Sequence, residues 1–281
     1  MAEGGGGEYL MTQKTIVACD ELVEGFRALG IEPGDVTISH SSLSSFGRVE
    51  GGANTVIEAM IEVVSPAGTA VFPTLAQRDI DRRFELWNID NTPSDVGRIT
   101  EVARLREDSI RSDHPTHSVC AIGPKAQELT EDHAGAWGRP SPWGPAAFGY
   151  GSPWEKLHQL NALHCFLGVT MRVNTMRHYI QSLLCESVLA GEKEPEEAAE
   201  GLQGWQKEGV WPHYDGEAMQ ERLTEKGLVT SVQIGEATCY SIRAQEMVRA
   251  ILAILRSEPE AWFKDDFLKW YHYYFTDSEE H

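Results

Sequence analysis

The apolar positions of the chain alternate between a helical period and short strand-like runs. The first segment follows a helical period from Thr15 and stops at Gly30. A short strand is predicted over 36–38, followed by a polar loop from 40 to 47 and an amphipathic helix over 53–64. Repeated strand, loop and helix units of this kind indicate an α/β fold.

The rest of the chain continues the same pattern. A capped helix is predicted after Thr92-Pro93-Ser94-Asp95, another begins at Ser152, and a last amphipathic helix covers 243–255. Further strands are predicted over 68–74, 119–122, 163–169, 228–234 and 238–242. We expect one domain over 15–257, with a central mixed sheet flanked by helices.

Three segments fall outside this regular pattern. Residues 1–14 have no basic and apolar signal-peptide regions and are interpreted as a flexible leader. An acidic insertion is expected near 187–215. The tail over 258–281 is rich in Trp, Tyr and Phe, so we expect it to pack on the body of the protein or on the partner subunit of a homodimer.

The most informative stretch runs from Leu163 to Glu186, where an apolar run breaks at Asn174-Thr175 and continues as a helix. Asn174 or Thr175 is a good N-cap, which places His178 in the first helical turn. A histidine held beyond a strand end by a rigid helix is suited to proton transfer near neutral pH. A structural role for His178 is equally compatible with the pattern.

Two loops carry candidate binding groups. The loop with Ser41, Ser42, Ser44 and Ser45 precedes a helix and could present hydroxyl and N–H groups to a phosphate, or could simply cap that helix. The polar loop over 77–95 is long and could grip a cationic ligand, or it could form a solvated face neutralised by nearby arginines. Its candidate carboxylates are Asp79, Glu85, Asp90 and Asp95.

The amino-acid composition argues against some classes of binding partner. The formal charge of -19 makes nucleic acid and anionic membranes poor partners and favours a small cationic amine. No run is long enough for a membrane span, and the five cysteines are scattered without CxxC spacing, so we expect a cytoplasmic protein with free thiols. His114 and His117 lack an evident third ligand and are expected to line a pocket or pack structurally, without a metal.

In chain order, a set of segments resembles the aminoglycoside 3-N-acetyltransferase family, the antibiotic N-acetyltransferases. They are HSSLSSFGRVEGGANTVIEAM, FPT followed by the acidic loop, NTPSDVG, RSDHPTHSVCAIGPKAQEL, SPWG, YGSPWEKL, LGVTMRVNTMRH and IGEATCYSIRAQEMV. The resemblance implies transfer of an acetyl group from acetyl-CoA to an amine of an aminoglycoside, as in antibiotic resistance. It also implies an α/β fold distinct from the small GNAT acetyltransferase fold.

The resemblance assigns roles to individual residues. His178 matches the base that activates the acceptor amine, and Thr175 is expected to face the cofactor or the developing oxyanion. The acidic loop would receive the cationic acceptor. The residues expected to contact acetyl-CoA are His40, Ser41, Ser42, Leu43, Ser44 and Ser118.

The chain departs from the family pattern at Gln181. The family usually has a glutamate three residues after the histidine, where a carboxylate orients the imidazole and stabilises its protonated form. Glutamine can orient the ring but adds no charge, and Glu186 lies too far along the helix to replace it. Two alternatives therefore stay open: an acetyltransferase for a different amine, and a CoA-binding protein with reduced catalysis.

Overall fold

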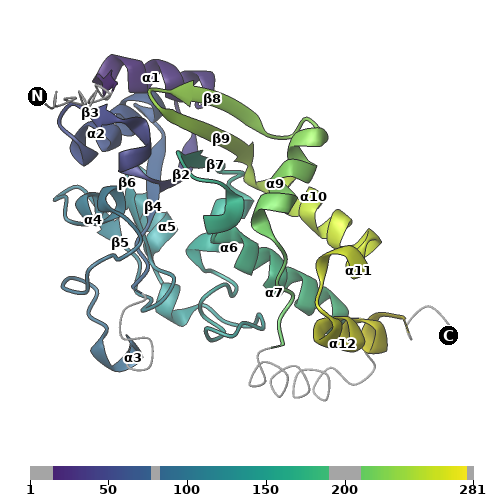
Figure 1. The fold of residues 1–281 in the computed structure, drawn as a ribbon. Coiled ribbons are helices and arrows are strands. Elements are labelled where there is room, and N and C mark those ends of the chain that lie inside the picture. The colour runs from purple at the N-terminus through teal and green to yellow at the C-terminus, as the bar shows by residue number, and fades with distance from the viewer. Residues whose placement is uncertain (1–14, 77–82, 190–209, 277–281) are drawn as a thin grey trace, which may run out of the picture.

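The protein forms three layers with a β-sheet in the middle (Figure 1). This is a computed structural model, and it describes residues 15–76, 83–189 and 210–276. The sequence prediction of an α/β fold with a mixed central sheet flanked by helices is confirmed. The leader over 1–14, most of the acidic insertion and residues 77–82, including Asp79, lie outside the described residues.

The main sheet has seven strands in the order β5-β6-β4-β2-β7-β9-β8. Strand β2 lies parallel to β4 and to β7, and the remaining neighbours are antiparallel. The strands are β2 (Val36–Ser41), β4 (Thr69–Pro73), β5 (Ile110–Arg111), β6 (Val119–Ile122), β7 (Leu163–Leu167), β8 (Thr230–Ile234) and β9 (Ala237–Arg243). A separate short pair joins β1 (Ile16–Val17) to β3 (Arg48–Val49).

Helices cover both faces of this sheet (Figure 1). One face packs against α1 (Cys19–Ala28), α2 (Ala53–Val64) and α4 (Arg98–Arg104). The other face packs against α5 (Ala126–Thr130), α6 (Pro153–Gln159), α7 (Met176–Leu189), α9 (Gly216–Glu225), α10 (Ala244–Ser257) and α12 (Asp265–Thr276). The shorter helices are α3 (Arg83–Leu86), α11 (Pro259–Trp262), and the 3-10 turns η1 (Leu43–Phe46), η2 (His133–Gly135) and η3 (Met171–Val173).

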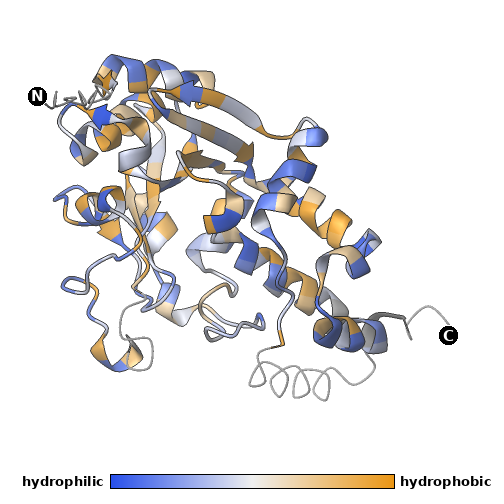
Figure 2. Ribbon diagram, in the orientation of Figure 1, coloured by the Kyte–Doolittle hydropathy of each residue, from blue (hydrophilic) through white to orange (hydrophobic). Residues whose placement is uncertain are grey.

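Alternating strand residues divide the core into two halves. In β7, Phe166 packs with the half that contains α7 and α10, whereas Cys165 and Leu167 pack with the half that contains α1 and α2. Successive side chains of a strand point to opposite faces, so a strand covered on both sides is apolar at most positions, and β7 departs from this only at the buried His164. The helices instead are banded in blue and orange, as expected when only one face is buried (Figure 2).

The aromatic tail packs on the body of the protein through α11 and α12. Phe263, Phe267, Trp270 and Tyr271 are buried and belong to the core half that contains α7. Helix α12 also contacts α7 directly, so the tail supports the helix that carries His178. None of the helices in the described ranges is both long and apolar enough to cross a membrane.

Three boundaries differ from the sequence prediction because tertiary contacts override local pattern. Ile16 is exposed and lies in β1, paired with Arg48, so the first helix begins only at Cys19. His40 was predicted in a loop but lies in β2, where it pairs with Phe166. The helix predicted after Thr92-Pro93-Ser94-Asp95 begins at Arg98, because Ser94 folds back and its N–H donates to the Glu101 side chain.

Candidate active site

A pocket of about 360 Å³ opens at the edge of the sheet where the parallel strands end. His40 and Ser41 close β2, Pro73 closes β4, and the segment after β7 supplies the opposite wall. The carboxyl ends of β2, β4 and β7 meet at this edge because the three strands are parallel. Ligands of open α/β sheets bind in this position.

His178 lines the pocket from the first turn of α7, and Gln181 holds its ring from behind. The Asn174 side chain accepts from the Met176 N–H at 3.0 Å, which caps the start of the helix. One helical turn on, Gln181 Oε1 lies 2.9 Å from His178 Nδ1. Residues three apart on a helix are neighbours, so the helix itself presents this pair.

Two further contacts determine the tautomer of His178. The Gln181 side chain is fully buried, and its Nε2 donates to the Pro212 carbonyl at 2.8 Å. Its Oε1 accepts from Trp211 Nε1 at 2.9 Å. Because that oxygen can only accept, His178 Nδ1 must donate to it. His178 Nε2 is therefore the nitrogen with the free lone pair.

Aromatic side chains surround the His178 ring. Its centroid lies 4.2 Å from that of Trp143, and 5.8 Å from those of His117 and Phe148. Burial among these rings, together with the positive charge of Arg177, lowers the pKa of His178 to about 3. The imidazole is thus neutral at physiological pH and available as a proton acceptor.

His40 and Thr175 join the end of β2 to the start of α7. His40 Nε2 accepts from the Thr175 N–H at 3.2 Å and lies 3.1 Å from the Thr175 hydroxyl. The His40 ring stacks on Phe166 with centroids 5.4 Å apart. Burial and the charge of Arg177 lower the pKa of His40 to about 4, so it too is neutral. This contact brings both predicted residues to the same wall of the pocket.

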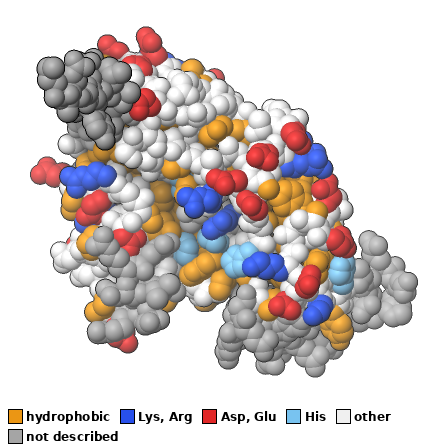
Figure 3. Space-filling model, viewed as in Figure 1, with side chains coloured by type: hydrophobic (Ala, Val, Ile, Leu, Met, Phe, Trp, Pro, Cys, Tyr) orange, Lys and Arg blue, Asp and Glu red, His pale blue; other side chains and the backbone are white. Residues whose placement is uncertain are grey.

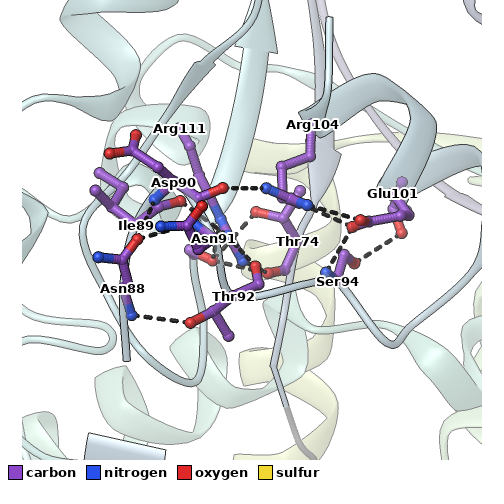
Figure 4. A network of polar contacts seen from close by, with 12 residues as sticks. Thr74, Asn88, Ile89, Asp90, Asn91, Thr92, Ser94, Glu101, Arg104 and Arg111 are labelled. Carbon is purple, nitrogen blue, oxygen red and sulfur yellow. Dashed lines mark hydrogen bonds and ion pairs between the residues drawn. The ribbon is translucent and has the colours of Figure 1, made fainter. Parts of the chain in front are cut away.

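Two half-buried arginines hold the loop that precedes α4 (Figure 4). Arg111 donates to the carbonyls of Ile89, Thr92 and Thr74 at 3.0, 2.6 and 2.7 Å. Arg104 donates to the Asp90 carbonyl at 2.7 Å. Charged donors to several carbonyls fix a loop strongly, so this loop is anchored to the sheet by its backbone.

The aminoglycoside 3-N-acetyltransferase family model matches residues 38–256, which include the whole pocket. The chain belongs to this family. Aminoglycoside N(3)-acetyltransferase III of Salmonella sp is 29% identical over 178 residues, covering 58% of this chain and 59% of that protein. The aminoglycoside N(3')-acetyltransferase-like protein YokD of Bacillus subtilis strain 168 is 31% identical over 179 residues, covering 56% and 62%. The chain thus aligns with about three-fifths of these relatives.

Solved structures share the acetyltransferase fold over a larger part of the chain. The aminoglycoside acetyltransferase AAC(3)-Xa superposes with a TM-score of 0.67 at 20% identity, covering 85% of this chain and 93% of that one. AAC-IIIb in a binary complex with CoASH has a TM-score of 0.65 at 19% identity, covering 89% and 99%. AAC(3)-IVa in complex with a gentamicin has a TM-score of 0.66 at 22% identity, covering 89% and 92%.

The residues predicted to bind acetyl-CoA fall into three places. His40 and Ser41 line the pocket, and the buried Ser41 hydroxyl has no hydrogen-bond partner in the described part of the chain. Leu43 and Ser44 line a neighbouring hollow together with Arg98. The remaining two predicted residues bond elsewhere: Ser42 Oγ accepts from Ser45 at 2.8 Å, and Ser118 Oγ donates to the Thr74 carbonyl at 2.8 Å.

The three predicted acceptor-binding carboxylates that the structure describes are not part of the pocket lining. Glu85 and Asp90 are exposed, Asp95 is partly exposed, and none of the three lines the pocket. Trp87 of the same loop lies beneath Arg111, whose guanidinium carbon is 4.5 Å from the ring centroid. No group of three or more His, Cys, Asp or Glu side chains within the described ranges is arranged to hold a metal ion.

Sequence reasoning missed Trp211, Pro212 and two pocket arginines, Arg172 and Arg177. The first two lie thirty or more positions from Gln181 along the chain, so no local pattern links them to His178. The arginines stand within the family-like segment LGVTMRVNTMRH, immediately around the predicted base. Two arginines so close to the predicted base were the signal that the sequence offered.

The substitution Gln181→Glu tests the hydrogen bond between His178 and Gln181. A carboxylate beside His178 should raise the pKa of His178 by about 1–3 units from its present low value. An NMR titration of the His178 ring should therefore show protonation beginning at higher pH in Gln181→Glu than in the parent protein. The carboxylate cannot donate to the Pro212 carbonyl, so we expect a loss of about 1–3 kcal/mol in unfolding free energy.

The matched control is Gln127→Glu, the same substitution at an exposed position of α5. It should leave the titration of His178 unchanged and lower the unfolding free energy by only about 0.2–0.5 kcal/mol, because it replaces the bond from Gln127 to Glu131 by a like-charge pair on the helix. The pairing is contradicted if Gln181→Glu folds but its His178 ring titrates at the same pH as that of the parent protein.

Proposed function

We propose that this protein transfers the acetyl group of acetyl-CoA to the amine of a small molecule, with His178 as general base. The observation that carries the proposal is the His178–Gln181 pair, which leaves a neutral imidazole nitrogen available in a pocket at the carboxyl edge of the sheet. Membership in the aminoglycoside 3-N-acetyltransferase family supports the same reaction.

The low pKa of His178 determines when the proton moves. Transfer from a free ammonium group, whose pKa is near that of lysine at about 10.4, to a group with a pKa of about 3 is strongly uphill. The amine therefore attacks in its neutral form. As the C–N bond forms, the nitrogen becomes positively charged and far more acidic, and its proton passes to His178 Nε2. The C–S bond then breaks, and the proton goes from His178 to the departing thiolate.

Several residues fit acetyl-CoA as the donor substrate. The unpartnered Ser41 hydroxyl offers a hydrogen bond inside the pocket. The adjoining hollow has the Ser44 hydroxyl and the Arg98 guanidinium on its walls, and these groups suit phosphates. The His40–Thr175 contact holds the wall between the strand end and α7. Thr175 is proposed to orient the reacting groups from that wall.

The family supplies a candidate acceptor. Its name refers to aminoglycosides, and related structures hold a gentamicin or sisomicin. An aminoglycoside acceptor is accordingly one form of the proposal, with Glu85, Asp90 and Asp95 as groups that would attract a polycation to the exposed loop. Acetylation of a different amine is the other form.

Two measurements test the proposed function. Calorimetry should show binding of CoA, and thiol release from acetyl-CoA should depend on added amine when aminoglycosides and simpler amines are screened. Folded protein that binds no CoA would refute the proposal. Tight CoA binding with no thiol release for any amine would instead support a CoA-binding protein with reduced catalysis, the alternative that Gln181 leaves open.

A further inference from the structure

Two arginines line the pocket beside the proposed base. Arg172 comes from η3, and Arg177 precedes His178 in the first turn of α7. No Asp or Glu is among the described residues that line the same pocket. In Figure 3, basic side chains and histidines gather near the middle of the face, next to apolar side chains and with acidic side chains at the edge of the group. The wall that faces a bound acceptor is therefore positively charged.

Arg177 lacks the compensation that buried arginines usually have. Its Nε atom is buried and has no hydrogen-bond partner in the part of the chain that the structure describes. The contrast is Arg139, whose guanidinium is paired with Glu155 at 2.7 Å and with Glu186 at 2.9 Å. Arg177 as a whole is half-buried, and a nitrogen that is buried in a pocket wall without a partner is one whose hydrogen bond a ligand can supply.

The positive charge of Arg177 acts on both His40 and His178. Its charge contributes to the lowered pKa of both His40 and His178, and the positive end of the fourteen-residue helix α7 adds to the same field. A cationic group at this place would meet repulsion from Arg177, Arg172 and the helix terminus. An anion would be attracted by all three.

The phosphates of acetyl-CoA do not explain these arginines. In the productive complex the thioester lies at His178, and the phosphates are separated from it by the whole pantetheine arm. Arg177 and His178 line the same pocket, so in this complex the Arg177 guanidinium lies nearer to the reacting end of the cofactor than to its phosphates. The hollow with Ser44 and Arg98 is a separate place with groups suited to phosphates.

We propose that the acceptor is an amine that also carries an anionic group, a carboxylate, phosphate or phosphonate, which Arg177 and Arg172 bind while the amine faces His178. The inference rests on the proposed acetyl transfer and specifies its acceptor. Arginine matches such anions with two parallel hydrogen bonds, so it orients the acceptor as well as attracting it. The bound anion also offsets the positive field at His178.

The net charge of -19 does not prevent an anionic group from binding inside the pocket. Charges on the surface are screened within about 8–10 Å at physiological ionic strength, whereas a partly buried guanidinium acts on its ligand directly. The carboxylates Glu85 and Asp90 are exposed and outside the pocket. The charges inside the pocket, and not the net charge of the chain, therefore decide which amine binds.

The test measures binding to the protein saturated with CoA, so that it does not depend on turnover. The ligands share one scaffold and differ in charge: 3-aminopropylphosphonate, 3-aminopropanol and 1,3-diaminopropane. We expect the phosphonate to bind most tightly, and Arg177→Gln to weaken it by about 10-fold or more. Arg177→Lys should restore part of the affinity, because it keeps the charge without the planar fork.

Two controls separate this inference from the proposed function. Arg249→Gln removes an exposed arginine of α10, whose side chain is 80% accessible, and should change nothing. The dissociation constant of CoA should be the same in Arg177→Gln, Arg172→Gln and the parent. Failure of CoA binding would refute the proposed function itself. The acceptor inference is overturned if CoA binds but the phosphonate does not, if 1,3-diaminopropane or gentamicin binds as well as the phosphonate, or if Arg177→Gln weakens CoA instead.

Discussion

Replacing His178 with alanine should lower kcat for acetyl transfer by about 10²–10⁴-fold, the usual contribution of a positioned general base. The KM for acetyl-CoA should change little, because the substitution removes a group that acts on the acceptor nitrogen. The fold should persist, since Gln181 keeps its bonds to Trp211 and Pro212. Steady-state thiol release with a circular dichroism spectrum of each variant makes the measurement.

The pH dependence of the activity of the parent protein gives a second test of His178 as the base. With a pKa of about 3, His178 is neutral above about pH 5, so the parent protein should show no acid limb from this group between about pH 5 and 8. The rise of activity with pH in that range should instead follow the ionisation of the acceptor amine. A more acidic amine should shift that rise to lower pH.

The control variant is His272→Ala, which removes a half-exposed histidine of α12. It should leave kcat unchanged. An unchanged rate in folded His178→Ala would remove His178 from the mechanism and would leave His40 or His117, which line or adjoin the site, as the groups to test next.

The sequence predicted well the elements whose ends are marked by local chemistry. Helix α2 begins and ends where its apolar period predicted, and β6 has its predicted bounds. The predicted start of α6 is confirmed by the Ser152 cap, whose hydroxyl accepts from the Glu155 N–H. In each case the signal lies within a few residues, so no distant contact was needed to read it.

The end of β2, which was predicted as a loop, shows a limit of prediction from local sequence. His40 and Ser41 are polar, and a polar run after a short apolar strand predicts a loop. They lie in β2 because the strand pairs with β7 up to Leu167 and ends at the pocket, where polar side chains face the ligand site. Polar strand ends of this kind occur at functional edges and therefore escape a pattern based on burial.

The candidate site was only partly predictable for the same reason. The helical spacing of His178 and Gln181 could be read directly, because both lie on one helix. The bonds that fix Gln181 come from Trp211 and Pro212, beyond the acidic insertion, and only the fold brings them together. The charge of the pocket likewise follows from which residues meet at the sheet edge, and the net charge of the chain does not reveal it.

The loss of Arg139 should destabilise the protein by about 3–5 kcal/mol, the largest stability effect that we expect from one substitution. Its side chain is only 5% exposed and is paired with Glu155 of α6 and Glu186 of α7. It also lies 4.0 Å from the centroid of the Tyr150 ring, and the Tyr150 hydroxyl bonds to Glu186. Arg139→Met keeps the aliphatic stem but leaves two carboxylates without their cation.

Chemical denaturation at neutral pH measures the loss. Arg249→Met serves as the matched control, because its exposed pair with Glu246 should contribute almost nothing. Adding Glu155→Gln to Arg139→Met should recover part of the stability by removing one buried charge. A destabilisation equal to that of Arg249→Met would show that the network does not hold these helices together.

The same substitution should also reach the active site. Arg139 anchors the irregular segment that carries Trp143 and Phe148, and these two rings enclose His178. A loosened segment admits water to the imidazole, and because burial is the main cause of its low pKa, the pKa of His178 should rise toward its ordinary value. In folded Arg139→Met, an NMR titration of the His178 ring should therefore show protonation beginning at higher pH than in the parent protein. An unshifted titration would mean that the aromatic wall is held in place without Arg139.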